Sequence, residues 1–437
     1  MRSINKDCEK QMPAIDAFLE LGSHYELNIV QTLLEDLDHP ERDLDIIHVA
    51  GTNGKGSTVS YLAHAFFQQK INVMTFTSPQ LRQYLDRFSF NGQAVEQKDF
   101  DLAEAIVLEA AGRIAGKQSR HATVFEMEVA ISFILAKNLG ARLFIMETGL
   151  GGRLDATNAV ERPLATVLTS ISLDHKAELG DSITAVAQEK AGIIKPGVPV
   201  FSTVQLAEAE KVLGDRAAEL EAPFRILSEA DIDILTDSLD SQCFIYDGHS
   251  YTIHLSGKHQ ILNAALAVMV LSNLPQPYSL SPETIGRGLE LTDWKGSFEL
   301  IARKPDIILD GAHNPDAAIA LSKNLRQFCS KGKCFGILHI FKDKDVVGVL
   351  QAVAGIFDKI WLPQMHKPRS LPAEQLQEIC RKYLQDTECL VMPSLKDAVA
   401  AVKAEAAAED TIVVFGSLSH LEAARKALIE IDEVVIK

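Results

Sequence analysis

The sequence predicts an α/β protein: a P-loop-type unit with a central, mostly parallel sheet, followed by a smaller Rossmann-like α/β unit. Three observations lead to this prediction. Apolar strand-like segments alternate with amphipathic helix-like segments through most of the 437 residues, which is typical of parallel strands with helices on both faces. A glycine-rich turn with a lysine follows the first strong strand. A second strand–helix alternation begins near residue 298.

The first unit, predicted to cover residues 1–297, contains five apolar strands. We expect them at residues 45–50, 73–77, 143–147, 165–170 and 198–202. Helices are expected to begin near Lys55, Glu126 and Ser182. The apolar stretch 261–274 is too short to span a membrane and is expected to be a buried helix. Segment 223–256 has short apolar runs and the turn pair Asp247-Gly248, which favour a small antiparallel addition.

The second unit, predicted to cover residues 298–437, repeats the alternation. Its strands are expected at residues 306–310, 335–338, 359–363, 388–391 and 411–415, and its last helix after Ser419. Ligands of open α/β sheets bind beyond the carboxyl ends of the strands. We therefore expect functional residues directly after these strands, in a cleft between the two units.

Composition excludes several classes of partner. The net charge of −16, from 43 basic and 59 acidic residues, argues against a nucleic-acid surface, which would need a basic face. Six cysteines without a C-x-x-C pair fit reduced thiols in a cytoplasm. The first fifteen residues, MRSINKDCEKQMPAI, lack the apolar core of a signal peptide. We expect a cytoplasmic protein that binds neither nucleic acid nor membrane.

The stretch HVAGTNGKGSTVSYLAHAF, residues 48–66, is similar to a phosphate-binding loop with altered spacing. The usual pattern is G-x-x-x-x-G-K-[ST], whereas here Gly56 separates Lys55 from Ser57 and a valine replaces the first glycine. A strand–glycine turn–helix directs backbone N–H groups at one point, where an anion is stabilised. The alternative is a plain turn with Ser57 as helix N-cap, which gives the lysine between two glycines no purpose.

A second glycine-rich stretch, LFIMETGLGGRLDATNAV at residues 143–160, begins with an apolar strand that ends at Glu147. An acid in this place often binds a metal in nucleotide enzymes. Glycines and polar residues follow it: Gly149, Gly151, Gly152, Arg153, Asp155 and Asn158. Glycines let the backbone pass close to a ligand. The alternative is an exposed loop with an ordinary glutamate.

Two later stretches indicate a functional site only in combination with the two glycine-rich stretches. His175 follows the strand at 165–170, and Lys190 lies in the helix after it. Either could be an ordinary surface residue. In the stretch ILDGAHNPDAA, Asp310 and His313 follow the first strand of the second unit and would face the cleft. Here the alternative is a simple helix cap before the Asn-Pro pair.

Together these motifs make the chain resemble the folylpolyglutamate synthase/dihydrofolate synthase family, a branch of the Mur ligases. The matching pieces occur in the family's order between residue 48 and about residue 346; the last ninety residues match mainly in architecture. The pieces are HVAGTNGKGST, TSPQL, TVFE, ETGLGGRLDATN, LDH, EKAGIIKPGVPV, GKHQILNAALAV, DGAHNP and FKDKDV. The inserted glycine of the loop is itself the family's form.

The resemblance implies an ADP-forming ligase that joins L-glutamate to a folate or dihydropteroate carboxylate. ATP phosphorylates the carboxylate, and the amine of glutamate attacks the acyl phosphate. Magnesium would screen the negative charges and stabilise the transition state. Members of the family are commonly monomers. The substrates are small molecules, and the resemblance does not separate the dihydrofolate from the folylpolyglutamate activity.

The resemblance also implies roles for individual residues. ATP would be bound by Asn53, Gly54, Lys55, Gly56, Ser57, Asn263, Asp310 and His313. Magnesium would be held by Ser78, Glu147 and His175. Catalysis would use Glu147, His175 and Lys190, the last as a carbamylated lysine that acts as an anionic metal ligand. The pterin or folate pocket would include Thr123, Val124, Phe125, Glu126, Leu154, Asp155 and Ala156.

Three departures from the family pattern leave alternatives open. WKGSFE has Ser297 where the family has an arginine that reaches the ATP phosphates, and a serine supplies neither its charge nor its fork; Lys295 is a candidate replacement. Gln80 replaces a histidine, and Ser419 ends a motif that usually ends in tyrosine. The alternatives are a non-catalytic relative that binds ATP or folate, and a ligase of the same fold that acts on a cell-wall nucleotide precursor.

Overall fold

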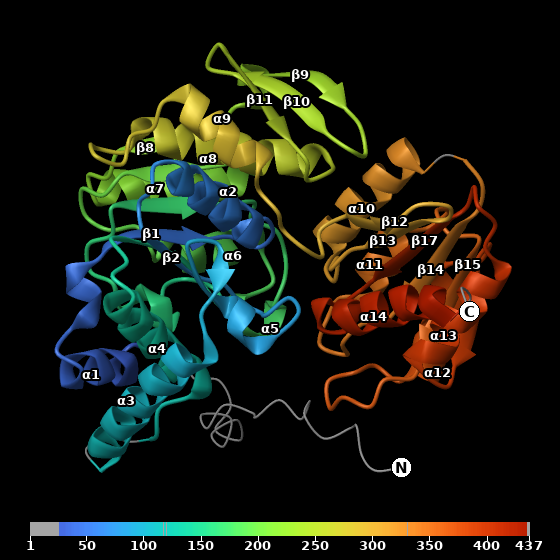
Figure 1. Ribbon diagram of the computed structural model, residues 1–437, viewed down its shortest axis with the longest axis horizontal. Helices are drawn as coiled ribbons and strands as arrows, with labels where there is room; N and C mark the ends of the chain where they lie inside the picture. The colour runs from blue at the N-terminus through green and yellow to red at the C-terminus, as the bar shows by residue number, and fades with distance from the viewer. Residues whose placement is uncertain (1–25, 117, 119, 330, 435–437) are drawn as a thin grey trace.

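The computed structural model describes residues 26–434 apart from 117, 119 and 330. Residues 1–25, with the predicted lack of a signal-peptide core and with Cys8, lie outside the described residues. Figure 1 shows two sheet-containing units side by side, the first from the blue to the yellow part of the chain and the second in orange and red. The α/β class is confirmed: each unit has a mostly parallel sheet covered by helices.

The first sheet has eight strands in the order β4-β3-β2-β5-β1-β6-β7-β8. They are β1 Asp45–Ala50, β2 Val73–Phe76, β3 Phe88–Phe90, β4 Gln93–Ala94, β5 Leu143–Glu147, β6 Ala165–Leu168, β7 Val200–Ser202 and β8 Phe224–Ile226. All pairs are parallel except β2–β3 and β3–β4 at one edge, which are antiparallel. Because Val49 pairs with Glu147 and Ala50 with Leu168, the loops after β1, β5 and β6 leave one edge together.

Helices cover both faces of this sheet because its strands are apolar on both sides. They are α1 Asn28–Asp36, α2 Lys55–Gln68, α3 Gln97–Ala115, α4 Val124–Asn138, α5 Lys176–Leu179, α6 Ile183–Ala191, α7 Ala207–Glu219, α8 Lys258–Asn273 and α9 Pro282–Glu290, with short 3₁₀ turns η2 Pro40–Asp43, η3 Tyr84–Arg87, η4 Ala156–Ala159 and η5 Glu229–Asp231. Ile47 packs with α2 and α8, and its neighbour Ile46 with α1, α3 and α4. This alternation is the pleat of a strand buried on both faces.

The apolar stretch 261–274 lies almost entirely within α8, whose central residues are buried. The prediction of a buried helix is therefore confirmed. Over the part of the chain that is described, no helix is long and apolar enough to cross a membrane.

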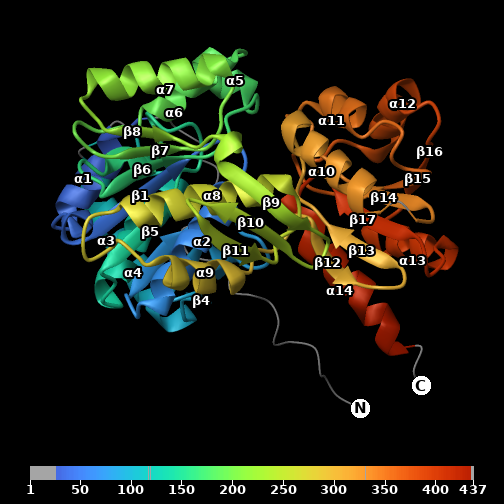
Figure 2. The ribbon, with the colours of Figure 1, turned by 90° about the horizontal axis from the view of Figure 1, so that it is seen from above.

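The antiparallel addition is confirmed with one correction. Strands β9 Ile232–Asp237, β10 Gln242–Tyr246 and β11 His249–Ile253 form a three-stranded sheet in the order β11-β10-β9. The turn between β10 and β11 uses Asp247 at φ 49° and Gly248 at φ 74°, as a tight hairpin requires. The start of the predicted segment, however, forms β8, which pairs in parallel with β7 in the main sheet. Figure 2 shows the small sheet reaching toward the second unit, where Arg303 pairs with Asp240 at 2.6 Å.

The second sheet has six strands in the order β12-β13-β17-β14-β15-β16. The strands are β12 Glu299–Ala302, β13 Asp306–Leu309, β14 Cys334–Leu338, β15 Lys359–Pro363, β16 Glu388–Met392 and β17 Thr411–Phe415; the helices are α10 Pro315–Phe328, α11 Val346–Ala352, α12 Ala373–Tyr383, α13 Leu395–Glu405 and α14 Leu418–Val434. All five predicted strands are present. The sequence missed β12, a half-exposed antiparallel edge strand whose pattern is weak. Helix α14 begins at Leu418, before Ser419.

Candidate active site

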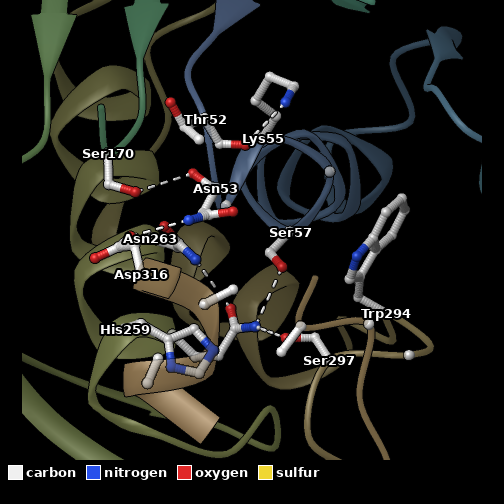
Figure 3. A pocket seen from close by; sticks show the side chains of 18 of the residues that line it. Thr52, Asn53, Lys55, Ser57, Ser170, His259, Asn263, Trp294, Ser297 and Asp316 are labelled. Atoms are coloured by element: carbon white, nitrogen blue, oxygen red, sulfur yellow. Dashed lines mark hydrogen bonds between the residues drawn. The ribbon is translucent and has the colours of Figure 1, made fainter. Parts of the chain in front are cut away.

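One cavity lies between the two sheets and is lined from both (Figure 3). The first unit contributes the loop after β1, the residues after β2, the end of β5 and one face of α8. The second unit contributes the loop after β13 and the first turns of α10. The segment that joins the units, residues 294–297, closes one side. This is the position expected for a ligand of α/β sheets, beyond the carboxyl ends of the strands.

The loop after β1 has the conformation of an anion-binding turn. Helix α2 begins at Lys55, and Gly54 is its N-cap with φ 85°, a left-handed value that glycine adopts without strain. The alternative with Ser57 as N-cap is wrong, because Ser57 lies inside the first turn of α2. A fourteen-residue helix that begins at the cavity directs its positive end toward it. Lys55 Nζ lies there too, donating to the Thr52 carbonyl at 3.1 Å.

Glu147 and Ser78 line the same cavity. Burial raises the pKa of Glu147 to about 7, although the charge of Lys55 and a hydrogen bond from the Ser78 N–H lower it. Lys55 Nζ is 3.6 Å from Glu147 Oε1, and the Ser78 N–H donates to Oε2 at 3.3 Å. A buried carboxylate with one cation nearby fits a hard metal ion, which prefers oxygen ligands. These two residues therefore suit magnesium.

His175, the third predicted metal ligand, is not among the residues that line the cavity. It caps the short helix α5 with φ 50°, an uncommon conformation for a residue with a side chain. Its Nε2 lies 3.2 Å from Lys344 Nζ. Burial, and then the charge of Lys344, lower the pKa of His175 to about 4, so the imidazole is neutral at pH 7. In the described part of the chain, no three His, Cys, Asp or Glu side chains are grouped as a metal site would require.

Lys190 is buried on α6 next to the phosphate loop. Its Nζ donates to the Gly51 carbonyl at 2.7 Å, and only 3 % of the residue is exposed. Burial and the charge of Lys55 lower the pKa of Lys190 to about 7. Gly152 allows this packing, because a Cβ there would lie 2.8 Å from the Glu189 carbonyl oxygen. Lys190 is thus buried beside the phosphate loop, although it is not among the residues that line the cavity.

The second unit brings Asp310 and His313 to the cavity, as expected. Asp310 accepts hydrogen bonds from the Phe298 and Ala312 N–H groups at 2.8 and 2.7 Å. Burial raises the pKa of Asp310 to about 6, against these hydrogen bonds. Asn314 is the N-cap of α10, followed by Pro315, as the Asn-Pro pair indicated.

Contacts across the cavity involve residues that the sequence analysis missed. Asn314 Nδ2 donates to Asn53 Oδ1 at 3.0 Å and to Asp174 Oδ2 at 3.2 Å. Lys344 Nζ donates to Asp174 Oδ1 at 2.8 Å, and His313 Nε2 is 3.4 Å from Oδ2. Burial alone would raise the pKa of Asp174, but the hydrogen bond from His313 and the charge of Lys344 hold it well below its usual range. No local pattern marks these charges, because each partner lies in a distant segment.

Asn263 and Gln260, on α8, face the phosphate loop. A Cβ on Gly54 would lie 2.5 Å from Asn263 Oδ1, so this side chain packs against the turn (Figure 3). Gln260 is fully buried and donates from Nε2 to Ser57 Oγ at 3.2 Å and to Ser297 Oγ at 2.8 Å. Gln260 was also missed, because a glutamine in an apolar helix carries no distinct signal.

The residues predicted for the pterin side do not line this cavity. Thr123 and Glu126 form a capping box at the start of α4, and Arg120 donates two 2.8 Å hydrogen bonds to the Glu126 carboxylate. Asp155 accepts from the Leu150 N–H at 2.8 Å and the Thr157 N–H at 3.0 Å. These carboxylates thus have partners close by in the chain. Of the remaining members, Leu154 is half-buried, Ala156 buried and Val124 half-buried.

Phe125 also belongs to that predicted set, and it packs against the second glycine-rich loop. A Cβ on Gly149 would lie 2.4 Å from the Phe125 ring. The two predicted pieces of the pterin side, TVFE and ETGLGGRLDATN, therefore touch.

The three departures lie in different surroundings. Ser297 lines the cavity, whereas Lys295 Nζ pairs with Asp293 at 2.8 Å and lies 3.6 Å from Glu299. The Lys295 ammonium is therefore paired with acidic residues and does not line the cavity. Gln80 is exposed, and Ser419 Oγ is hydrogen-bonded to Ser417 Oγ at 2.9 Å.

Comparison with known proteins agrees with this architecture. Residues 49–271 match the Mur ligase middle domain, and residues 298–418 match the Mur ligase glutamate ligase domain. The dihydrofolate synthase/folylpolyglutamate synthase of Bacillus subtilis is 30% identical over 427 residues, 94% of this chain and 96% of that protein. The chain belongs to the folylpolyglutamate synthase/dihydrofolate synthase family of the Mur ligases. The resemblance inferred from the motifs is thereby confirmed.

Solved structures of this family share the whole fold. The Escherichia coli FolC protein, in complex with DHPP and ADP, superposes with a TM-score of 0.83 at 27% identity, over 96% of this chain and 97% of that one. A bifunctional folylpolyglutamate synthase/dihydrofolate synthase with Mn, AMPPNP and L-glutamate bound gives a TM-score of 0.81 at 29% identity, over 95% and 97%.

Proposed function

We propose that this protein is an ATP-dependent ligase that joins L-glutamate to the carboxylate of a folate or dihydropteroate, forming ADP and phosphate. The observation that carries the proposal is the cavity between the sheets, where the phosphate loop, Glu147 and the Asp310–His313 segment meet. Family membership supports the reaction class. The ADP, DHPP, Mn, AMPPNP and L-glutamate of the related structures are the ligands that such a cavity would hold.

In this reaction the phosphate loop would bind the triphosphate. Backbone N–H groups at the start of α2 and the Lys55 ammonium would offset its charge. Asn53, Gly54, Gly56 and Ser57 shape the same turn, with Asn263 packed against it. Asp310 and His313 would contact the nucleotide from the second unit.

Ser78 and Glu147 would hold magnesium, and His175 would join them as a third ligand once the site is loaded. The ion, when bound, would offset the negative charge shared by the phosphates and the acceptor carboxylate. Glu147 must be ionised for this; burial raises its pKa to about 7, and the positive charge of the ion would favour the ionised form. His175 already has a neutral imidazole at pH 7, as a metal ligand requires.

The acceptor carboxylate would attack the γ-phosphorus and release ADP. The amine of glutamate would then attack the carbonyl carbon of the acyl phosphate, releasing phosphate and one proton. The residues of the chain contribute positioning and charge. Lys55 would remain beside the transferred group, and Asp174 holds Lys344 and His313 at the edge where the two units meet. The segments 123–126 and 154–156 would form the pterin side.

Lys190 would act as a carbamate. Its uncharged amine would attack the carbon of CO₂, forming an N–C bond and releasing one proton to water. The lowered pKa of about 7 leaves about half of the amines uncharged near pH 7. We expect Lys190→Ala to lose the ligase activity and ¹³C-bicarbonate to give a carbamate signal in wild type that is absent from the variant. A fully active Lys190→Ala variant would refute this role.

The test of the function is phosphate release by the purified protein with ATP, Mg²⁺ and L-glutamate, with dihydropteroate and tetrahydrofolate offered in parallel. Mass spectrometry of the products assigns the acceptor. No release with either pterin acceptor, together with ADP binding in a calorimeter, would favour the non-catalytic alternative. Turnover with a UDP-muramyl acceptor in place of a pterin would favour the cell-wall alternative.

The proposal includes two structural units, residues 1–297 and 298–437, and a monomer in the cytoplasm. The cavity is lined by residues of both units of the chain. The described cysteines Cys243, Cys329, Cys334, Cys380 and Cys389 are free thiols, which suits a reducing compartment. Analytical ultracentrifugation would test the monomer.

A further inference from the structure

The segment that joins the two units contains an aromatic ring over the phosphate loop. Trp294 lines the cavity and packs against the buried core of the first unit. A Cβ built on Gly56 would lie 2.1 Å from Cζ2 of the indole ring and 2.8 Å from two further ring atoms. Gly56 is helical, with no left-handed φ. Its backbone conformation therefore does not demand glycine; the ring above it does.

The residues around Trp294 tie this segment, which we call the joining strap (residues 293–298), to the first unit. Ser60 Oγ donates to the Asp293 carbonyl at 3.2 Å. Gln260 Nε2, on α8, donates both to Ser297 Oγ of the strap and to Ser57 Oγ of α2. The strap is thus bonded to α2 directly through Ser60 and indirectly, through Gln260 of α8, to Ser57. Figure 3 shows Trp294, Ser57 and Ser297 around the cavity.

The same strap is tied to the second unit. The Gly311 N–H donates to the Gly296 carbonyl at 2.8 Å, and the Phe298 N–H donates to Asp310 Oδ2 at 2.8 Å. The backbone is strained at this point: Phe298 has φ 45° and is buried. Strained backbone persists where its surroundings hold it in place. The strap therefore connects the phosphate loop to the Asp310 side of the cavity by a short, restrained path.

We propose that Trp294 is a positioning residue of the nucleotide site, whose indole ring fixes the Gly56 turn and links it to the second unit. Gly56 is then a glycine because Trp294 lies over it, not because a phosphate needs the space. Nucleotide that orders the phosphate loop would therefore change the surroundings of Trp294 in the strap. A displaced strap would in turn disturb the loop. The inference rests on the proposed function only in its use of a nucleotide as ligand.

A double-mutant cycle separates the two reasons for the glycine. Gly56→Ala should weaken ADP binding roughly ten- to hundredfold, because a filled space would be overpacked. In the Gly56→Ala/Trp294→Ala variant the ring is gone, and ADP should bind no more weakly than it does to Trp294→Ala alone. If the two losses simply multiply, the glycine serves the phosphates and the proposal is wrong.

The control for the cycle is Gly214→Ala. Gly214 is also helical, in α7, and its Cβ would meet nothing closer than 3.8 Å, so ADP affinity should not change. For wild type and variants, isothermal calorimetry with ADP measures the affinity, and thermal unfolding checks the fold. Trp294→Phe should keep most of the affinity, whereas Trp294→Ala should raise the KM for ATP severalfold and leave the KM for glutamate unchanged.

Fluorescence gives a second readout that does not depend on Gly56→Ala folding. The chain has two tryptophans, and Trp361 is buried in the core of the second unit. In Trp361→Phe, saturating ADP should shift the emission of Trp294; in Trp294→Phe, it should leave the emission of Trp361 unchanged. Unchanged Trp294 emission would overturn the proposal even if the protein is an active ligase. If ADP binds with the expected emission shift but no ligation occurs, the proposal for Trp294 is supported and the proposed ligase function is wrong. If ADP does not bind, both are wrong.

Discussion

The nucleotide cavity and the predicted pterin side satisfy their polar groups in different ways. Glu147 has Lys55 at 3.6 Å and one N–H at 3.3 Å, both from other loops. Asp155, by contrast, accepts from Leu150 and Thr157, which lie within five residues of it. The first carboxylate is buried with incomplete partners, whereas the second is completed by its own loop.

This difference predicts how the two regions respond to substitution. An incompletely paired group at a cavity is available to a ligand, and its loss should reduce activity more than stability. A carboxylate bonded within its own loop holds that loop, and its loss should reduce stability first. The predictions below, from the largest expected effect to the smallest, test this contrast.

Lys55→Met should lower the turnover of ATP by on the order of 10²–10³-fold, because the charge beside the transferred phosphate is lost. The unfolding midpoint should change less than the turnover, since Lys55 makes one hydrogen bond, to Thr52, and a 3.6 Å ion pair with Glu147, which can take up a proton when the lysine is removed. A phosphate-release assay and thermal unfolding measure the two quantities. Lys211→Met, at an exposed lysine on α7, is the matched control. Strong destabilisation by Lys55→Met would contradict the contrast.

Asp155→Ala should lower the free energy of unfolding by about 2–4 kcal/mol, because two backbone N–H groups and the Thr157 hydroxyl lose their acceptor. Urea unfolding measures the loss. Asp215→Ala, at an exposed residue of α7, should cost less than about 0.5 kcal/mol. Normal stability with a raised KM for the pterin acceptor would show that Asp155 serves the ligand instead.

Glu147→Gln should change how stability depends on pH. The folded-state pKa of about 7 lies above the ordinary value of 4.5 for a glutamate, so between these values the folded protein binds more protons than the unfolded chain. The stability of ligand-free wild type should therefore fall as pH rises from about 4.5 to about 7. Glu147→Gln lacks this titrating group. Its free energy of unfolding relative to that of wild type should therefore increase over that pH window by on the order of 1–3 kcal/mol. If the free energy of unfolding of Glu147→Gln relative to wild type decreased with rising pH, the burial of Glu147 would be contradicted. The control is Glu219→Gln at an exposed residue, whose stability relative to wild type should not change between pH 4.5 and about pH 7.

Ser297→Arg should lower the KM for ATP severalfold. Among the described residues, one lysine, Lys55, lines the cavity, and the arginine would add a second cation beside the phosphates. Lys295→Ala should leave the KM unchanged, since its ammonium pairs with Asp293. Initial rates at varied ATP measure both. A raised KM in Lys295→Ala would show that this lysine turns toward the phosphates when nucleotide binds.

Much of the site could be predicted from local sequence. The strand before Lys55, the strand that ends at Glu147 and the Asn-Pro pair before α10 each carry their signal within a few residues, and each forms the expected element. Parallel strands place their carboxyl ends at one edge, so the loops after them had to meet. The pairings of Asp174 with Lys344 and of Gln260 with Ser297 could not be predicted, because the partners lie in distant segments.

The sequence by itself determined the α/β alternation, the glycine-rich turn with Lys55 and the family to which the chain belongs, because these depend on periodicity and on residues close together in the chain. The tertiary structure decided which groups are buried, and burial moves the pKa values of Glu147 and Lys190 to about 7. It also decided that Asn53 meets Asn314, 261 positions away, and that Trp294 covers Gly56. Burial and long-range contact arise only when separate segments pack, and a local pattern does not record them.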